Sequence, residues 1–229
     1  MNETAADRLP TLRQDGAVFV LDLGDGENRF NPAWVAAIEG HLDGVEAADG
    51  PRALVTVATG KFWSNGLDLE YLGAHPDELG AFLDRVHRLF GRVLGLGAPT
   101  VAAVQGHAFA AGAMLAVCHD RVVMREDRGF WCVPEVDLRM PFTAGMTALL
   151  TGRLPGATAR EAMLTGRRYG GPDAVAAGIA DAVATEDEVL ARALDLARPH
   201  AEKDPATVAR IKARLHADTL AELARHQEL

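Results

Sequence analysis

The sequence predicts an α/β fold built as one domain, in which a strand-rich core is followed by a helical region. Its 229 residues suffice for one large α/β domain but not for two of ordinary size. Short apolar runs bounded by glycine alternate with longer amphipathic stretches, which indicates that strands alternate with helices. From about residue 144 onward the patterns are those of helices. The sequence contains no linker, internal repeat or low-complexity segment that would divide it.

Turn and cap signals define the elements of the first half. Residues 17–23 form an apolar strand between glycines, and Asn31-Pro32 supplies an N-cap and a first-turn proline for a helix over residues 31–48. A strand over residues 53–58 ends at Gly60. An amphipathic stripe predicts a long helix over residues 77–96. A strand over residues 100–105 then leads to a buried helix that begins near Ala111.

The second half begins with two short predicted strands, residues 121–124 and 130–133, around a charged turn. Thr158 and Glu161 have the spacing of a capping box, which predicts a helix start at Thr158. Pro172 opens another helix, and residues 180–184 form a last short strand. Helices over residues 187–202 and 205–225 follow. We therefore expect a core over residues 1–185 and a C-terminal helical region over residues 186–229.

Composition and charge exclude several classes of function. The formal net charge of -9 argues against duplex nucleic acid or an anionic membrane surface as the main partner. Cys118 and Cys132 lie inside apolar runs, which predicts core residues in a reducing compartment rather than a disulfide framework or a metal site. The polar, acidic start is unlike a secretory signal, and no apolar run reaches the ~18 residues of a membrane span. We expect a cytoplasmic protein.

Two strand-to-helix turns carry the strongest functional signal. Residues 106–112 form a turn of small residues before a buried helix, and a second turn surrounds Gly66. Backbone N–H groups at a helix start carry partial positive charge and are accessible where side chains are small. Two such turns facing each other would offer two N–H donors to one carbonyl oxygen, an arrangement that stabilises an enolate. The alternative is that glycine merely permits tight packing at both turns.

Three motifs, in this order, resemble those of the crotonase (enoyl-CoA hydratase/isomerase) superfamily. They are Phe62-Trp-Ser-Asn-Gly-Leu-Asp-Leu, Gly106-His-Ala-Phe-Ala-Ala-Gly and Pro134-Glu-Val-Asp-Leu, and the similarity covers residues 15–215. The resemblance implies a crotonase-like spiral core of ββα units with a C-terminal helical region. It also implies acyl-CoA thioesters as substrates, and a homotrimer or a hexamer made of two trimers.

The resemblance also implies the residues that carry the chemistry. The superfamily's oxyanion hole uses the N–H after the glycine of the first motif, here Leu67, and a second N–H at the small-residue turn, here Ala111. Ala110 and Ala111 replace part of the usual glycine run. Hydratases pair two glutamates to activate water, whereas this chain has Met114 at the first position and keeps only the second, Glu135. This departure favours a Δ3-Δ2 enoyl-CoA isomerase, in which Glu135 moves a proton from C2 to C4.

The binding site of coenzyme A is implied in the same way. Residues 27–31 match the family segment that borders the pantetheine and phosphate groups, and a guanidinium suits the geometry of a phosphate. Trp63 and its neighbours are expected to hold the adenine and thioester ends through their backbone. A metal or redox cofactor is not expected, because coenzyme A enters as part of the substrate. The residues predicted to contact it are Arg29, Phe30, Lys61, Trp63, Asn65 and Gly66.

Several residues keep a second interpretation. Taken alone, Glu135 could be a solvated carboxylate that pairs with Arg139 or Arg128. Asp137, expected on the same face of a strand, is the competing carboxylate and is interpreted as structural. His107, next to the small-residue turn, is better explained by packing than by catalysis. Two apolar stripes are either ordinary core or functional surfaces: Phe82, Val86 and Phe90 as an acyl tunnel, and Val208, Ile211, Leu215, Leu220 and Leu223 as a contact with a neighbouring subunit or the active site.

The alternatives to an isomerase come from two classes. One is another crotonase-type enzyme, such as a hydratase or hydrolase that uses Glu135 alone. The other is a catalytically silent protein that binds acyl-CoA. The motifs themselves fix neither the length of the acyl chain nor the metabolic role.

Overall fold

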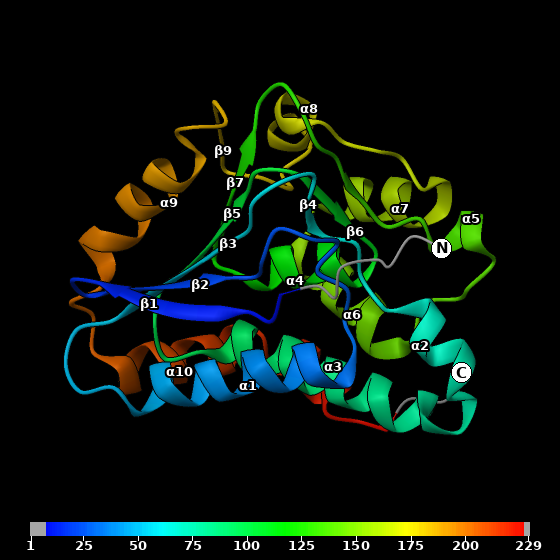
Figure 1. The fold of residues 1–229 in the computed structure, drawn as a ribbon, viewed down its shortest axis with the longest axis horizontal. Helices are drawn as coiled ribbons and strands as arrows, with labels where there is room; N and C mark the ends of the chain where they lie inside the picture. The colour runs from blue at the N-terminus through cyan, green and yellow to red at the C-terminus, as the bar shows by residue number, and fades with distance from the viewer. Residues whose placement is uncertain (1–7, 227–229) are drawn as a thin grey trace.

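The fold is a spiral of strand–strand–helix units (Figure 1). The computed structural model describes residues 8–226, so the polar start of the chain, residues 1–7, lies outside the described residues. A six-stranded sheet has the order β1-β2-β3-β5-β7-β9, and a three-stranded sheet has the order β4-β6-β8. β1 (Thr11–Asp15) pairs antiparallel with β2 (Val18–Asp22), while the other strand pairs of both sheets are parallel.

Each of three successive units gives one strand to each sheet. The consequence is that the segments following β4, β6 and β8 meet at one edge of the small sheet, because parallel strands end on the same side. The units are β3 (Ala53–Val57) and β4 (Phe62–Ser64) with α2 (Leu69–Ala74) and α3 (Leu79–Gly95); β5 (Thr100–Val104) and β6 (His107–Phe109) with α4 (Ala111–Cys118); and β7 (Arg121–Arg125) and β8 (Trp131–Cys132) with α5 (Glu135–Leu138).

The large sheet is covered on both faces. α9 (Val189–Ala197) packs on β3, β5 and β7 from one side (Figure 1), over the small apolar residues that alternate strands present to it. On the other side lie α1 (Pro32–Ala47), α3 and α4, which share the main core with Trp34, Trp63 and Trp131. The predicted cap of α1 is confirmed, because Asn31 Oδ1 accepts a hydrogen bond from the Trp34 N–H at 3.0 Å.

The remaining helices extend the core rather than forming a separate layer. α11 packs on α6 and α3, and α10 packs on α3. The predicted boundary between residues 185 and 186 stays a prediction, although α9, beyond it, covers the large sheet. Within residues 8–226 no helix has the length and apolar character needed to cross a membrane. These elements are α6 (Ala144–Arg153), α7 (Gly156–Thr165), α8 (Gly171–Ala176), β9 (Ala182–Ala184), α10 (Pro205–Leu215), α11 (Ala217–Leu223) and two 3-10 turns, Pro76–Glu78 and Arg198–His200.

Three predictions of secondary structure are wrong. The capping box at Thr158 does not form: α7 begins at Gly156, and the Thr158 hydroxyl instead donates to the Ala177 carbonyl at 2.7 Å. The single tail helix is two, because the chain leaves helical geometry at His216. The strand geometry assumed for Glu135 and Asp137 is absent, because Glu135 begins the short helix α5. The strand and the helix expected on either side of the Gly66 turn are confirmed as β4 and α2, whereas the sequence patterns missed β1 and β6, which are short.

An ion pair between a buried lysine and a partly exposed aspartate connects the C-terminal region to the core. Lys212 of α10 donates to Asp120 Oδ2 at 2.7 Å and to the Ala98 carbonyl at 2.8 Å. Asp120 is itself fixed, because its Oδ2 accepts from the Thr100 N–H at 2.8 Å. Lys212 is buried and Asp120 is partly exposed, so the pair joins a helix of the tail to the first residue of β5.

Replacing Lys212 by methionine should lower the free energy of unfolding by about 2 kcal/mol, because the Ala98 carbonyl and the Asp120 carboxylate each lose a partner. Urea denaturation followed by circular dichroism would measure the change. Lys203→Met, at an exposed lysine, is the control and should change stability by less than about 0.5 kcal/mol. Equal effects of the two variants would contradict the structural role of the pair.

Candidate active site

A largely apolar cavity of about 420 Å³ opens where β4, β6 and β8 end. Its wall combines the loop after β2, the turns that lead into α2 and α4, one residue of α3, and the segment from α5 to α6. Polar side chains are few in this wall. The lining residues are Arg29, Asn65, Leu67, Leu69, Leu83, Phe109, Ala110, Ala111, Pro134, Glu135, Asp137, Leu138, Met140, Pro141, Thr143, Met146 and Arg168.

The Leu67 N–H is turned away from its neighbouring strand. Leu67 forms a parallel bridge with Phe30, in which the Phe30 N–H donates to the Gly66 carbonyl at 2.8 Å and the Asp68 N–H donates to the Phe30 carbonyl at 3.0 Å. In this pattern the N–H of the bridged residue itself points to the opposite side. Leu67 lines the cavity, and its N–H is directed away from the Phe30 segment.

The second donor group lies at the start of α4. Ala111 is the first residue of this helix, so its N–H has no acceptor within the helix. A Cβ atom on Gly66 would lie 3.0 Å from the Ala111 nitrogen and 2.9 Å from the Phe109 carbonyl oxygen. The two turns that the sequence singled out therefore lie against each other, and glycine at position 66 is what permits the contact. Gly66 also has a φ of +80°, a conformation that suits glycine.

Ala110, between β6 and α4, has a strained backbone. Its φ is +51° and its ψ is −123°, a region that residues with a side chain rarely occupy. Two hydrogen bonds hold it there: its N–H donates to the Cys132 carbonyl at 2.9 Å, and its carbonyl accepts from the Met114 N–H at 3.0 Å. The strain is thus imposed by β8 and by the first turn of α4, and it lies directly beside the Ala111 N–H.

Glu135 is the buried carboxyl group of the cavity. It is only 7% exposed, and its Oε2 atom has no hydrogen-bond partner among the described residues. Burial raises the pKa of Glu135 from 4.5 to about 7, since an apolar environment disfavours the charged form. A carboxyl group with a pKa near neutrality can accept and return a proton at that pH. The interpretation of Glu135 as a solvated carboxylate is excluded by its burial.

Asp137 does not share the face of Glu135, contrary to the strand-based expectation. Both lie in the helix α5, where two residues are separated by about 200° around the axis. Asp137 is exposed, and its Oδ2 would be 2.6 Å from a Cβ built on Gly166, at the C-terminal end of α7. It borders the cavity, but its carboxylate is directed toward α7.

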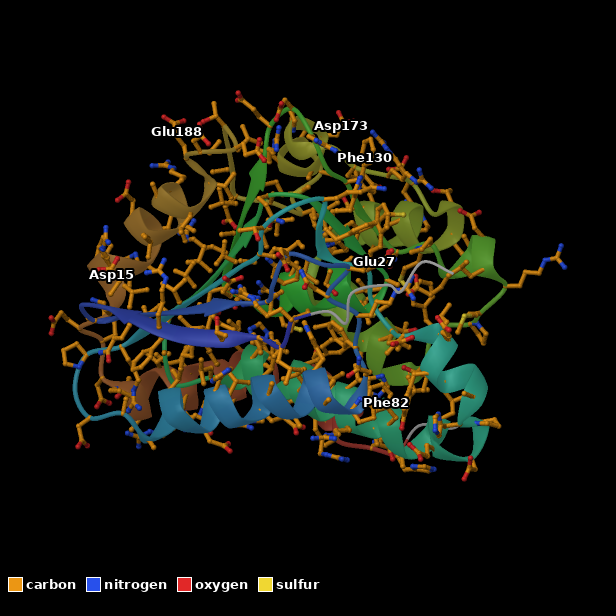
Figure 2. The ribbon with its side chains drawn as sticks, in the orientation of Figure 1. Asp15, Glu27, Phe82, Phe130, Asp173 and Glu188 are labelled. Atoms are coloured by element: carbon orange, nitrogen blue, oxygen red, sulfur yellow. The ribbon has the colours of Figure 1, made fainter. Side chains whose placement is uncertain are left out.

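Of the six residues predicted to contact coenzyme A, Arg29 and Asn65 belong to the cavity lining, whereas Phe30, Lys61, Trp63 and Gly66 do not. Arg29 and Asn65 line the cavity, and Glu27 holds both through its Oε2 atom, at 2.6 Å from Arg29 Nε and 2.9 Å from Asn65 Nδ2. Figure 2 shows Glu27 near the centre of the view. Burial acts to raise the pKa of Glu27, but the hydrogen bonds from Asn65 and Arg29 lower it below the ordinary value. Lys61 is exposed and stacks over Phe62 at 5.0 Å, outside the cavity lining.

The side chains of Phe30 and Trp63 are both fully buried. Phe30 stacks on Trp34 with ring centroids 4.5 Å apart, and Trp63 Nε1 donates to the Thr56 carbonyl at 3.4 Å. Packing, not contact with a ligand, is therefore what the structure gives these two side chains. Phe30 instead contacts Leu67 through the backbone bridge between them, and Trp63 precedes Asn65 in the chain.

The structure also decides between the two interpretations of the α3 stripe, as an acyl tunnel or as ordinary core. Phe82, Val86 and Phe90 are buried in the core, and Figure 2 shows Phe82 among the helices on the lower side of the view. The α3 residue that reaches the cavity is Leu83. The sequence reasoning missed Met140, Thr143, Met146 and Arg168, because the segments that carry them lack a periodic pattern and their position depends on the tertiary fold.

Met114, His107 and His119 do not belong to the cavity lining. Met114 is fully buried in α4 and does not belong to the cavity lining. His119 is fully enclosed, with Nε2 2.8 Å from Thr56 Oγ1, and burial lowers its pKa to about 4. His107 packs against Phe109 with ring centroids 4.9 Å apart, which agrees with a packing role. Among the described residues, no group of three or more His, Cys, Asp or Glu side chains is arranged to hold a metal ion.

Comparisons with known proteins agree with this geometry. The model of the enoyl-CoA hydratase/isomerase family matches residues 14–229. Enoyl-CoA delta isomerase 2, peroxisomal, of Arabidopsis thaliana is 38% identical over 188 residues, which cover 78% of each chain. Enoyl-CoA delta isomerase 3 of the same plant is 37% identical over 184 residues, or 76% of each chain. Since some of these relatives are named peroxisomal, the expected cytoplasmic location stays a prediction.

Solved structures show the same fold. An enoyl-CoA isomerase of Mycobacterium tuberculosis superimposes with a TM-score of 0.85 at 28% identity, covering 93% of this chain and 93% of that chain. An enoyl-CoA hydratase of Mycobacterium marinum gives a TM-score of 0.84 at 28% identity, covering 93% and 94%. The chain therefore belongs to the enoyl-CoA hydratase/isomerase family, and it is an enzyme of that family with the crotonase fold.

Replacing Ala110 by glycine should raise the free energy of unfolding by about 1 kcal/mol, because removal of the Cβ relieves a positive φ whose cost exceeds the added entropy of the unfolded chain. Thermal and urea denaturation would measure it. Ala108→Gly, two positions earlier and within the strand β6, is the control and should lower stability. A loss of stability in both variants would contradict the strain.

Replacing Glu135 by glutamine should make stability less sensitive to pH. The folded pKa of about 7 lies above the value of 4.5 for a free glutamate, so wild type loses stability as pH rises between these values, by about 3 kcal/mol. Glutamine carries no proton to lose. The variant should match wild type at pH 4 and exceed it by ~2–3 kcal/mol at pH 8 in urea denaturation. The exposed Glu126→Gln is the control, and parallel curves for Glu135→Gln and wild type would contradict the raised pKa.

Proposed function

We propose that the protein is a Δ3-Δ2 enoyl-CoA isomerase that moves the double bond of a 3-enoyl thioester to the 2-trans position. The observation that carries the proposal is the buried Glu135 carboxyl group in the same cavity wall as the Leu67 and Ala111 turns. One group that exchanges a proton, two N–H donors for an oxyanion and an apolar wall for an acyl chain are the parts that this reaction needs.

In the proposed reaction the thioester carbonyl oxygen accepts hydrogen bonds from the Leu67 and Ala111 N–H groups. This polarises the carbonyl and acidifies the C2–H bond. The ionised Glu135 removes the C2 proton, and the electron pair delocalises through the C3–C4 double bond to give a dienolate. The neutral Glu135 then returns the proton to C4, which leaves the double bond between C2 and C3. Each N–H donor is expected to lower the barrier by about 3 kcal/mol.

The remaining parts of the thioester are assigned to the polar and apolar walls. Arg29 and Asn65, held by Glu27, lie on the side of the cavity that suits the pantetheine and phosphate groups. Leu83, Met140 and Met146 suit the acyl chain. We assign no metal or redox cofactor to this reaction, because the proton transfer uses side-chain and backbone groups of the protein. A trimer or a hexamer stays the expected oligomer.

Hydration of a 2-enoyl thioester is the competing activity. It requires one group to deprotonate water and another to deliver a proton, and the family pattern places the partner glutamate of Glu135 at the position of Met114. Methionine at this buried position supplies neither function. Asp137, with its carboxylate directed toward α7, is less suited to replace it.

The test is the conversion of trans-3-hexenoyl-CoA to the conjugated thioester, measured by absorbance. Glu135→Gln should lower kcat by ~100-fold or more, whereas Asp137→Asn should retain most of the activity. The wild-type rate should rise with pH through an apparent pKa near 7, because the carboxylate must be ionised to remove the proton. Crotonyl-CoA should be hydrated poorly.

The outcomes separate the alternatives. Activity that survives in Glu135→Gln but is lost in Asp137→Asn would move the base to Asp137. Efficient hydration of crotonyl-CoA would favour a hydratase. Binding of the thioester by wild type without turnover of either substrate would leave another reaction of this fold, or a protein that only binds acyl-CoA.

A further inference from the structure

Ser64, the last residue of β4, is a fully buried hydroxyl at the base of the Gly66 turn. Its Oγ atom accepts a hydrogen bond from the Gly66 N–H at 3.2 Å, one residue before Leu67. The same hydroxyl donates to the Asn28 carbonyl at 2.7 Å. Since both its donor and acceptor capacity are used, the hydroxyl has a defined orientation and fixes the turn against the loop that follows β2.

Asn28 extends this network from the other side. It is fully buried with a φ of +50°, and its Nδ2 atom donates to the Trp63 carbonyl at 3.1 Å and to the Phe62 carbonyl at 3.3 Å. Hydrogen bonds between Asn28 and the residues of β4 therefore run in both directions and join the loop after β2 to this strand. The backbone of Asn28 is left-handed. Its carbonyl accepts from the Ser64 hydroxyl, and its side-chain amide donates to carbonyl groups of β4.

Ser64 also touches the start of α4, where the other N–H donor lies. A Cβ on Gly112 would lie 2.7 Å from Ser64 Cβ and 2.8 Å from Ser64 Oγ. The first turn of α4, which contains Ala111, therefore packs directly against this side chain. One small side chain thus holds the turn before Leu67 by a hydrogen bond and supports the turn of Ala111 by contact.

We propose that Ser64 is a positioning residue that sets the separation and direction of the Leu67 and Ala111 N–H groups, with Asn28 as its anchor. The inference rests on the proposed function, since it assigns a cause to the geometry of the oxyanion site. Removal of the hydroxyl leaves the Gly66 N–H and the Asn28 carbonyl without their partner. The Gly66 turn then loses its tether, and the Leu67 N–H loses its direction while Glu135 keeps its surroundings.

The test combines kinetics with the infrared spectrum of a bound ligand. Ser64→Ala should lower kcat for trans-3-hexenoyl-CoA by about tenfold or more with KM within about twofold, because a displaced donor weakens the transition state more than it weakens binding. The apparent pKa of the pH–rate profile should not move. With trans-2-hexenoyl-CoA carrying ¹³C at the thioester carbonyl, the shift of the C=O stretch to lower frequency on binding should be smaller in the variant than in wild type.

Thr158→Val is the matched control, because it removes a buried hydroxyl that donates to the Ala177 carbonyl outside the cavity lining. It should lower stability while leaving kcat and the carbonyl shift unchanged. If Ser64→Ala does not fold, Ser64→Cys, which keeps a weaker donor and acceptor, should give an intermediate shift. A full carbonyl shift and wild-type kcat in either Ser64 variant would overturn the inference and leave the isomerase proposal intact.

The failure of the proposed function is distinguishable. Wild-type turnover without any carbonyl shift would mean that the two N–H groups do not bind the oxygen, which overturns the positioning role but keeps the isomerase activity. Absence of both turnover and shift in wild type would overturn the proposed function itself.

Discussion

The site depends on a backbone-to-backbone contact between two turns. Gly66 lies against Ala111 so closely that a Cβ on the glycine would be 3.0 Å from the Ala111 nitrogen, and a Cβ on Gly112 would be 2.5 Å from the Ser64 carbonyl oxygen. Parallel pairing of β4 with β6 brings the two turns to the same edge, with Phe62 opposite His107 and Ser64 opposite Ala108. Small residues then let the turns meet. Any side chain at Gly66 or Gly112 would force the two turns apart.

Much of this arrangement could be predicted from the sequence, and the reasons are local. Asn31-Pro32 specifies the start of α1, and the glycines of the two turns mark where strands end, because such signals act within a few residues. The order of the three motifs indicated the family, which the comparisons confirm. Within that fold Glu135 is buried because it directly follows β8 and the apolar run that ends at Pro134.

The remaining features of the site could not be predicted from the sequence, because they depend on tertiary structure. Glu135 and Asp137 have the spacing of a strand face, but the chain turns into α5 directly after Pro134, which separates them. Phe82 and Leu83 are adjacent in an apolar stripe, and only the packing of α3 decides which one reaches the cavity. Thr158 fits a capping box, yet its hydroxyl finds a partner in Ala177, nineteen positions away. The capping pattern indicates only the nearby partner that is common for a threonine at a helix start. It cannot show that a carbonyl far along the chain is the actual partner.

The large sheet belongs to the hydrophobic core, whereas the small sheet positions the segments that line the cavity. The large sheet is covered on both faces by apolar helices and contributes no residue to the cavity, whereas the segments after β4, β6 and β8 contribute most of its wall. A change such as methionine for glutamate at position 114 lies inside α4, where the side chain is fully buried. A second buried carboxylate there would have to be ionised or protonated at a cost, and like charges would raise the pKa of both groups. Methionine fills the position without that cost, and burial is then the main influence on the pKa of Glu135, opposed by a hydrogen bond from the backbone of Glu135.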